Sequence, residues 1–417
     1  MDYPEKEIVI IGGGASGLMA AAAAASENAS VTVLEYNEKP GKKLLASGNG
    51  RCNLTNLKLD TSAYHSDHPE RAERVLNRFS VQNTLRFFKT LGLRTFDRGG
   101  WVYPSTEQAS QVRDLLLWEC ERLGVRFKTH EEVISLRPDP SGSGYLIHTK
   151  GWKYRTGSVI IACGSMASSV RGSSDTAVRL ADTMGIPRHP FLPILVPLRI
   201  KEKVYTSMNG TRVHAALKLL VDRRQEAEEE GELQMTSYGV SGIPVFQLSR
   251  IAVPALNQDS EVILLIDFLP DISGSELKEE WNMREANAPE KTNFQLLTGI
   301  IPEKVIPVVL HAAGLRPHEV PHLTDHAVGG PTDRLLALLK QFPVTITGTA
   351  PFEQAQVCTG GIALSSLTDS LMVRKYPGLY AAGEAVHVDG PCGGYNLQWA
   401  WSSGYVAGCA AALGETE

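Results

Sequence analysis

The first 35 residues contain a strand, a glycine-rich turn, a helix and a second strand in immediate succession. The apolar run at 8–11 predicts a buried parallel strand, and the alanine-rich stretch that follows the turn predicts a helix. Between them, Gly12, Gly14 and Gly17 form the pattern G-x-G-x-x-G. The first glycine permits a tight turn, the second lets the backbone approach a pyrophosphate, and the third lets the helix lie close to the strand. This order predicts a dinucleotide-binding Rossmann domain.

The second strand, over 30–34, ends in Glu35. An acid about 20 residues beyond such a glycine turn typically binds the hydroxyls of a ribose. The competing interpretation is a solvated acid at the end of a strand.

The composition excludes several classes of protein. Of the 417 residues, 43% are hydrophobic and 21% charged, as in soluble globular proteins, and the length predicts two or three domains. A formal net charge of −5 and a pI near 6.2 give no general attraction to nucleic acid. The six scattered cysteines form no CxxC pair, which suits a reducing compartment. With no signal peptide or apolar stretch of about 20 residues, we expect a cytoplasmic protein.

The pattern of apolar and polar residues changes near residue 188 and returns to its earlier form near 345. Short alternating runs predict a β-rich segment over 189–270, and a capping-box pattern at Ser273 begins a helical segment over 271–344. We therefore expect an α/β fold, in which a nucleotide domain over 1–188 and 345–417 is interrupted by a β-plus-α insertion.

Two charged segments have simple interpretations. The acidic run Glu226 to Glu232 predicts the exposed tip of a hairpin. Helical periodicity over 69–91 places Arg71, Arg74 and Arg78 on one face, and the interleaved glutamates favour a solvated face.

Four histidines fall at spacings that suggest metal ligands: His311, His318, His322 and His326. Prolines interrupt the helix that would align them, and no cysteine or paired carboxylate completes a ligand set. No metal site is predicted.

Several dispersed motifs resemble the bacterial HI0933-like, or aminoacetone-oxidase-like, FAD-binding family. The resemblance rests on the glycine turn and on six further blocks: 41–53 (GKKLLASGNGRCN), 237–244 (SYGVSGIP), 347–349 (TGT), 356–361 (QVCTGG), 377–383 (PGLYAAG) and 389–404 (DGPCGGYNLQWAWSSG). It implies a fold of the glutathione-reductase type with an inserted β-barrel-like and helical domain. The chain departs from the family pattern over 165–175, where a glycine-rich stretch is usual.

The resemblance also implies which residues line FAD. The glycine turn would hold the pyrophosphate, Glu35 the adenosine ribose, and the segment that begins at Gly393 the isoalloxazine ring. The full set is Gly12, Gly14, Ala15, Ser16, Gly17, Glu35, Lys42, Lys43, Gly50, Arg51, Cys52, Asn53, Val133, Ala162, Gly164, Gly383, Glu384, Asp389, Gly393, Gly394, Tyr395, Asn396 and Leu397.

The activity that the resemblance implies is reduction of an activated C=C bond. No second complete G-x-G-x-x-G unit is present, so NADH or NADPH would bind transiently against the flavin. The leading hypothesis is an FAD-dependent reductase of a small, hydrophobic, enone-bearing substrate such as a bile-acid intermediate, working as a monomer or homodimer. The alternatives are reduction of uridine in ribosomal RNA, and an amine or aminoketone oxidase or noncatalytic FAD protein.

Such a reduction needs a proton donor near the ring. The candidates are Cys392, Tyr395, Cys52 and His387. Each has a structural alternative, since buried cysteines are often inert, Tyr395 could pack on the flavin, and His387 could lie at the surface. Cys392 and Tyr395 rank first because they lie in or next to the Gly393–Gly394 segment.

Overall fold

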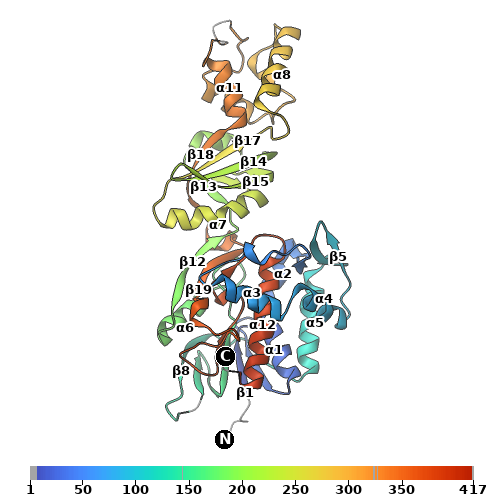
Figure 1. Cartoon of the computed structure of the whole chain (residues 1–417), viewed down its shortest axis with the longest axis vertical. Coiled ribbons are helices and arrows are strands. Elements are labelled where there is room, and N and C mark those ends of the chain that lie inside the picture. The colour runs from blue at the N-terminus through green and yellow to red at the C-terminus, as the bar shows by residue number, and fades with distance from the viewer. Residues whose placement is uncertain (1–6, 143, 323–324, 326, 416–417) are drawn as a thin grey trace. The chain divides into compact units, whose positions relative to one another are not determined.

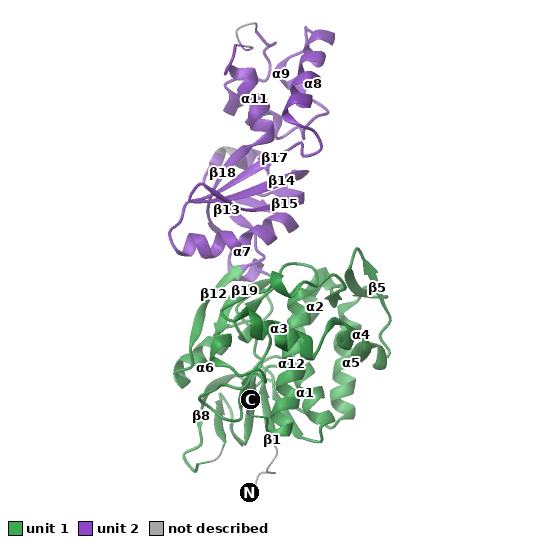
Figure 2. Ribbon diagram, viewed as in Figure 1, with its two compact units in different colours: residues 1–193, 356–417 green, residues 194–355 purple. Residues whose placement is uncertain are grey.

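Contacts along the chain group into two units, one formed by residues 1–193 and 356–417 and the other by 194–355 (Figure 2). The computed structural model describes residues 7–142, 144–322, 325 and 327–415. The domain boundaries expected at 188 and 344 lie near these limits but stay predictions, because the contacts do not separate a β-rich from a helical segment in the insertion.

The core of unit 1 is a five-stranded sheet in the order β20-β11-β1-β2-β7, paired in parallel throughout. Strands β1, β2 and β11 are mostly apolar and buried, because helices or further strands cover both faces of the sheet, whereas the edge strand β7 is Arg-Phe-Lys with both charged residues exposed. Their bounds are β1 Glu7–Ile11, β2 Ser30–Leu34, β7 Arg126–Lys128, β11 Ser158–Ile161 and β20 Leu379–Ala381. The expected Rossmann fold is confirmed.

Two helices from opposite ends of the chain, α1 (Ala15–Ser26) and α12 (Tyr395–Leu413), lie side by side in this unit (Figure 1). Side chains at Gly404 and Gly408 of α12 would collide with the carbonyl oxygens of Ser16 and Ala20 in α1. The alanines of α1 and these glycines therefore serve close packing of the two helices.

The rest of unit 1 consists of short elements around this core. Its other helices are α2 Lys42–Ala46, α3 Pro69–Arg78, α4 Val81–Thr90, α5 Ala109–Arg122 and α6 Thr176–Met184, with short 3₁₀ turns at Ser47–Gly50, Thr61–Ala63, Leu364–Ser366 and Gly383–Ala385. Its other strands are β3 Thr55–Asn56, β4 His65–Ser66, β5 Thr95–Arg98, β6 Trp101–Pro104, β8 Val133–Pro138, β9 Tyr145–Thr149, β10 Lys153–Thr156, β12 Arg188–Ile194, β19 Val357–Ile362 and β21 Val388–Asp389.

The helix expected over 69–91 is broken in two, because Ser80 caps α4 in a capping box with Asn83. The prediction of a solvated arginine face was wrong for Arg71, which is buried. Its Nε donates to Asp369 Oδ1 at 2.9 Å and its Nη1 to the Leu364 carbonyl at 2.8 Å. A buried guanidinium requires such partners.

Unit 2 contains a closed barrel in the strand order β13-β16-β15-β14-β17-β18, together with five helices among the described residues. This confirms the expected insertion of a β-barrel-like and helical domain. The strands are β13 Leu198–Ile200, β14 Arg212–Val221, β15 Arg224–Met235, β16 Gly239–Ser241, β17 Val262–Asp267 and β18 Phe342–Thr349. The helices are α7 Ile243–Asn257, α8 Gly274–Asn287, α9 Asn293–Leu297, α10 Ile306–Ala313 and α11 Pro331–Lys340, with 3₁₀ turns at Lys203–Met208 and Phe352–Gln354.

The acidic run Glu226 to Glu232 lies along β15 and not at a hairpin tip, so that prediction was wrong. The tip is Asp222-Arg223, whose φ angles of 47° and 67° suit a two-residue hairpin turn. The strand tolerates its alternate glutamates because they face basic residues of β14, as in the 2.9 Å contact between Glu230 and His214.

Within the described residues, no helix combines the length and the apolar character needed to cross a bilayer.

Candidate functional site

The three glycines of the first turn have different structural roles. Gly12 adopts a φ of 102°, and a Cβ there would lie 2.6 Å from the Ala162 carbonyl oxygen. A Cβ at Gly17 would collide with the carbonyl oxygen of Gly12. At Gly14, by contrast, a Cβ would meet nothing within 4 Å. Gly12 and Gly17 are therefore required by packing, whereas Gly14 leaves open space at the amino terminus of α1, where N–H groups and the helix dipole favour an anion.

Glu35 is buried and is not a solvated acid. Its Oε2 accepts from the Gly13 N–H at 2.8 Å, and its Oε1 accepts from the backbone and side-chain N–H groups of Asn37 at 2.7 and 2.8 Å. These bonds fix the carboxylate at the carboxyl end of β2, beside the glycine turn. A carboxylate has about four lone-pair sites, so one of them is left for a ribose hydroxyl.

Glu384 joins three segments that are far apart in the sequence. Lys43 Nζ lies 2.6 Å from its Oε2, while Ser165 Oγ and the Cys358 N–H donate to its Oε1 at 2.8 and 3.2 Å. The 42–53 loop, the 165–175 segment and the late Gly-Glu motif thus meet at one carboxylate.

Gly383 brings the same motif to the start of α1. Its φ is 66°, its N–H donates to Ser403 Oγ at 2.9 Å, and a Cβ there would contact the Ser16 side chain. Gly383 and Glu384 therefore lie, with the glycine turn, at the carboxyl end of the parallel strands, where open α/β sheets bind ligands.

The start of α12 is tied to the loop around Asn53. With its amide oxygen facing Gly394, Asn53 accepts from the Gly394 N–H at 3.2 Å, and Asn56 Nδ2 donates to the Gly393 carbonyl at 2.9 Å. A Cβ at Gly394 would lie 2.6 Å from the Thr55 carbonyl oxygen. Glycine is needed here for close approach between backbones.

Asn396 closes the turn that precedes α12. Its Oδ1 accepts from the Gly390 N–H at 2.9 Å, and its Nδ2 donates to the Gly390 carbonyl at 2.8 Å. The next residue, Leu397, lies in the first turn of the helix.

The remaining predicted cofactor residues are more spread out. Lys42 Nζ donates to Asn37 Oδ1 at 3.4 Å, and Val133 is buried in β8. Gly164 has a φ of 70° and open space where a Cβ would be. Arg51, next to Gly50, is exposed and lies 3.9 Å from Glu107, so its contacts are at the surface.

Two of the four candidate proton donors, Cys52 and Tyr395, are held inside the fold by neighbouring groups. Cys52 is fully buried, and burial raises the pKa of its thiol to about 12. The Tyr395 hydroxyl accepts from the Asp60 N–H at 3.2 Å and donates to the Lys58 carbonyl at 3.4 Å, and its ring packs on Tyr64.

The other two candidates differ in exposure. Cys392 is partly exposed in the loop before α12, with Sγ 3.9 Å from Gln356 Oε1. His387 is buried, which differs from the surface position that was one of its two interpretations.

His387 belongs to a group of polar residues that the sequence prediction missed. Strands β4 and β21 pair antiparallel, with Asp389 opposite His65 and Val388 opposite Ser66. His65 Nδ1 lies 3.2 Å from Asp389 Oδ2, and His387 Nδ1 lies 3.6 Å from Asp67 Oδ1. The signal was present as two H-x-D motifs, 65–67 and 387–389, whose period of two puts each histidine and aspartate on one face of a strand.

The electrostatics of this group follow from burial and hydrogen bonding. Burial by itself raises the pKa of the Asp67 carboxyl, but hydrogen bonds from His387, Ser365 and the Leu364 N–H bring it well below its usual range. Burial, followed by the neighbouring His387, lowers the pKa of His189. Asp67 is therefore ionised and His189 neutral near pH 7.

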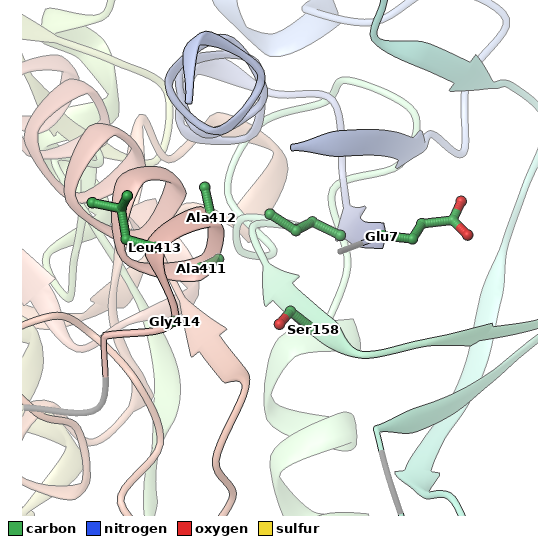
Figure 3. Close-up of a pocket in the computed structure, with 7 residues that line it drawn as sticks. Glu7, Ser158, Ala411, Ala412, Leu413 and Gly414 are labelled. Atoms are coloured by element: carbon green, nitrogen blue, oxygen red, sulfur yellow. The ribbon is translucent and has the colours of Figure 1, made fainter. Parts of the chain in front are cut away.

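A pocket of about 200 Å³ lies elsewhere in unit 1 (Figure 3). It is lined by Glu7 and Ser158, at the amino ends of β1 and β11, and by the end of α12. The Glu7 carboxylate is held by Arg126 Nη2 at 2.6 Å. Because parallel sheets bind ligands at the opposite, carboxyl end, this pocket is not the candidate cofactor site.

The chain is similar in sequence to one protein family and to several characterised relatives. The family model described as HI0933-like protein Rossmann domain matches residues 6–410. A 3-dehydro-bile acid delta(4,6)-reductase of Clostridium scindens is 42% identical over 386 residues, which are 92% of this chain and 93% of that protein. A ribosomal RNA dihydrouridine synthase of Escherichia coli is 27% identical over 376 residues, 90% of each chain.

Among solved structures, the fold is similar to that of 3-ketosteroid delta1-dehydrogenase from Sterolibacterium denitrificans in complex with 1,4-androstadiene-3,17-dione. The TM-score is 0.53 at 12% identity, and the match covers 98% of this chain and 100% of that one.

Proposed function

The chain belongs to the HI0933-like FAD-binding Rossmann family, and on that premise we propose that it is an FAD-dependent reductase of an activated C=C bond in a small steroid-like substrate. The observation that carries the proposal is the relative at 42% identity over 92% of the chain, whose name is that of a bile-acid delta(4,6)-reductase. NADH or NADPH is proposed as the reductant that binds transiently.

The residues at the carboxyl end of the sheet fit FAD. Gly14 leaves the space that a pyrophosphate needs at the amino terminus of α1, and Glu35 is fixed beside it with an acceptor site remaining. We assign the pyrophosphate to the Gly12–Gly17 turn, the ribose to Glu35, and the ring end to the segment from Gly393 to Leu397. When bound, FAD supplies the hydride chemistry, and the protein supplies orientation and a proton.

We assign the proton to Cys392 Sγ. Adding a hydride to one carbon of an enone requires a proton at the other, so an acid must be accessible to the substrate. Three of the four candidates fit this requirement less well. Cys52 and His387 are buried, and the Tyr395 hydroxyl is hydrogen-bonded to backbone groups. Cys392 is partly exposed and directly precedes Gly393.

The reduction of ribosomal RNA is the second candidate, since the dihydrouridine synthases match 90% of this chain. The lower identity of 27% and 26%, the net charge of −5 and the acidic strand β15 disfavour it.

The experiment is an anaerobic measurement of the two half-reactions of the FAD-loaded protein. NADH or NADPH should reduce the flavin, and a 3-oxo-4,6-diene bile acid should reoxidise it, whereas the saturated 3-ketone should not. Ribosomal RNA fragments serve as the competing acceptor. Reoxidation by RNA and not by the dienone would refute the proposal.

The role of Cys392 is tested in the same assay. Cys392→Ala should leave flavin reduction unchanged and slow reoxidation by the dienone by about 10²–10⁴-fold. Cys409→Ala, which removes another partly exposed thiol from the far part of α12, is the matched control. Equal reoxidation rates for the two variants would remove Cys392 from the mechanism.

A further inference from the structure

The two H-x-D segments form a pair of facing strands. In the register of β4 and β21, His65 stands opposite Asp389 and Ser66 opposite Val388. Continued by one residue, the same register sets Asp67 opposite His387, and their Oδ1 and Nδ1 atoms lie 3.6 Å apart. Side chains directly opposite in an antiparallel pair lie on the same face of the sheet. All four imidazole and carboxylate groups therefore point to one side.

Neighbouring strands complete the group. Thr359 of β19 places Oγ1 3.4 Å from both His65 Nδ1 and His387 Nε2. His189 of β12 packs its ring against His387, with the centroids 4.2 Å apart. The ligand atoms of His65, His387 and Asp389 all lie within 4.8 Å of one another, as do those of Asp67, His189 and His387.

Small side-chain movements would bring these atoms to the spacing of ligands around one metal ion. With metal–ligand bonds of about 2.0–2.1 Å, neighbouring ligand atoms of a tetrahedral ion lie about 3.3 Å apart. The 3.2 Å between His65 Nδ1 and Asp389 Oδ2 already matches that spacing. Two imidazoles and one carboxylate form a common set for zinc and related divalent ions.

His387 is held in the orientation that a metal ligand needs. Its Nδ1 is buried and faces Asp67 Oδ1 at 3.6 Å. The Asp67 carboxylate is fixed in turn by the N–H groups of Leu364 and Ser365, at 2.9 and 3.0 Å. A carboxylate behind one imidazole nitrogen directs the other nitrogen toward a metal.

The side chains of this group differ in their exposure to solvent. The Asp389 and His387 side chains are 2% and 8% exposed, whereas that of His65 is 56% exposed. An ion would thus reach the site past His65 and bind against a buried floor.

We propose that His65, His387 and Asp389 bind a divalent transition-metal ion, best matched by zinc, with Asp67 orienting His387 from behind. The ion would join β4 to β21, the strand that leads into the Gly390–Gly394 segment before α12. The proposal is independent of the substrate and of the redox reaction.

The test is a competition titration of the chelator-treated, FAD-loaded protein with Zn²⁺. We expect one bound ion per chain. His65→Ala, at an exposed side chain, should weaken binding by more than about 100-fold, and Asp67→Asn, behind the ligand, by about 10–100-fold. His214→Ala is the control, since His214 also contacts a glutamate, Glu230, but belongs to none of the candidate metal groups found among the described residues.

Thermal unfolding keeps the test decisive if a variant folds poorly. Zn²⁺ should raise the melting temperature of the wild type and of His214→Ala but not of His65→Ala. Absence of stoichiometric binding by the wild type, or binding that His65→Ala leaves intact, would overturn the proposal and show only two cross-strand histidine–aspartate pairs. X-ray absorption should find zinc with nitrogen and oxygen ligands at about 2.0–2.2 Å.

Discussion

Replacement of Gly14 by alanine should separate cofactor binding from folding. The Gly14 backbone has φ −78° and ψ −169°, which any residue adopts, and its Cβ would meet no protein atom within 4 Å. The free energy of unfolding of the FAD-free protein should therefore not fall, and loss of a glycine can raise it by about 0.4–1 kcal/mol. The new methyl group would project into the space that the pyrophosphate needs.

The expected loss of affinity follows from the bonds that the methyl group displaces. A hydrogen bond to a charged group contributes about 1.5–3 kcal/mol, so losing one such N–H to phosphate bond should raise the Kd for FAD by about 10–150-fold. Kd is measured by quenching of flavin fluorescence, and stability by urea unfolding of the FAD-free protein followed by circular dichroism.

Gly17→Ala is the informative contrast to this variant. Its Cβ would collide with the Gly12 carbonyl oxygen, so it should lower the stability of the FAD-free protein by about 1–3 kcal/mol. If Gly14→Ala bound FAD as tightly as the wild type, the assignment of the pyrophosphate to this turn would be refuted. If it destabilised the FAD-free protein as Gly17→Ala does, the distinction between the two glycines would be wrong.

Three further outcomes are expected. Hydrogen bonds from Arg74, which has the larger effect, and from Arg71 hold the pKa of Asp369 at about 2. The stabilising contribution of this carboxylate is therefore present above about pH 4 and is lost as the pH falls toward 2. In acid titrations of unfolding, Asp369→Asn should make the free energy of unfolding less dependent on pH over that range. Gln398→Ala should cost about 1–3 kcal/mol in urea unfolding, since it removes buried bonds to Thr55, Thr84 and Ser402. In the native protein, Cys392 should react with a thiol reagent while Cys52 stays unlabelled until unfolding, as mass spectrometry would show.

Each of these expectations has a control. Gln225→Ala on β15 removes an exposed glutamine and should leave stability within about 0.5 kcal/mol. An unchanged acid profile for Asp369→Asn would contradict the stabilising role of that pair. Labelling of Cys52 in the native state at the rate of Cys392 would contradict its burial.

Local sequence predicted the nucleotide-binding half of the fold because the signals there are contiguous. The apolar runs of β1, β2 and β11, the glycine turn and the alanine-rich helix each specify structure within a few residues. Short alternating runs predicted a β-rich segment and the family resemblance implied that it is barrel-like, but neither predicted the register of its strands.

Errors arose where a residue's environment is set by distant parts of the chain. Arg71 looks like a member of a solvated face until Asp369, 298 residues away, is packed against it. The acidic run looks like a loop until the basic residues of β14 are seen opposite. The His65–Asp389 contact joins residues 324 positions apart, so the two H-x-D motifs gain meaning only through strand pairing.

The packing of α12 on α1 affects when the protein can become functional during its synthesis. A ribosome releases α1 and the glycine turn first, but their close-packed partner, together with strand β20, is encoded more than 350 residues later. The nascent chain must keep an apolar, alanine-rich helix and an unfinished sheet in solution until that segment emerges. Cofactor capture should therefore wait until α12 has emerged, and the nascent amino-terminal half should depend on chaperones until then.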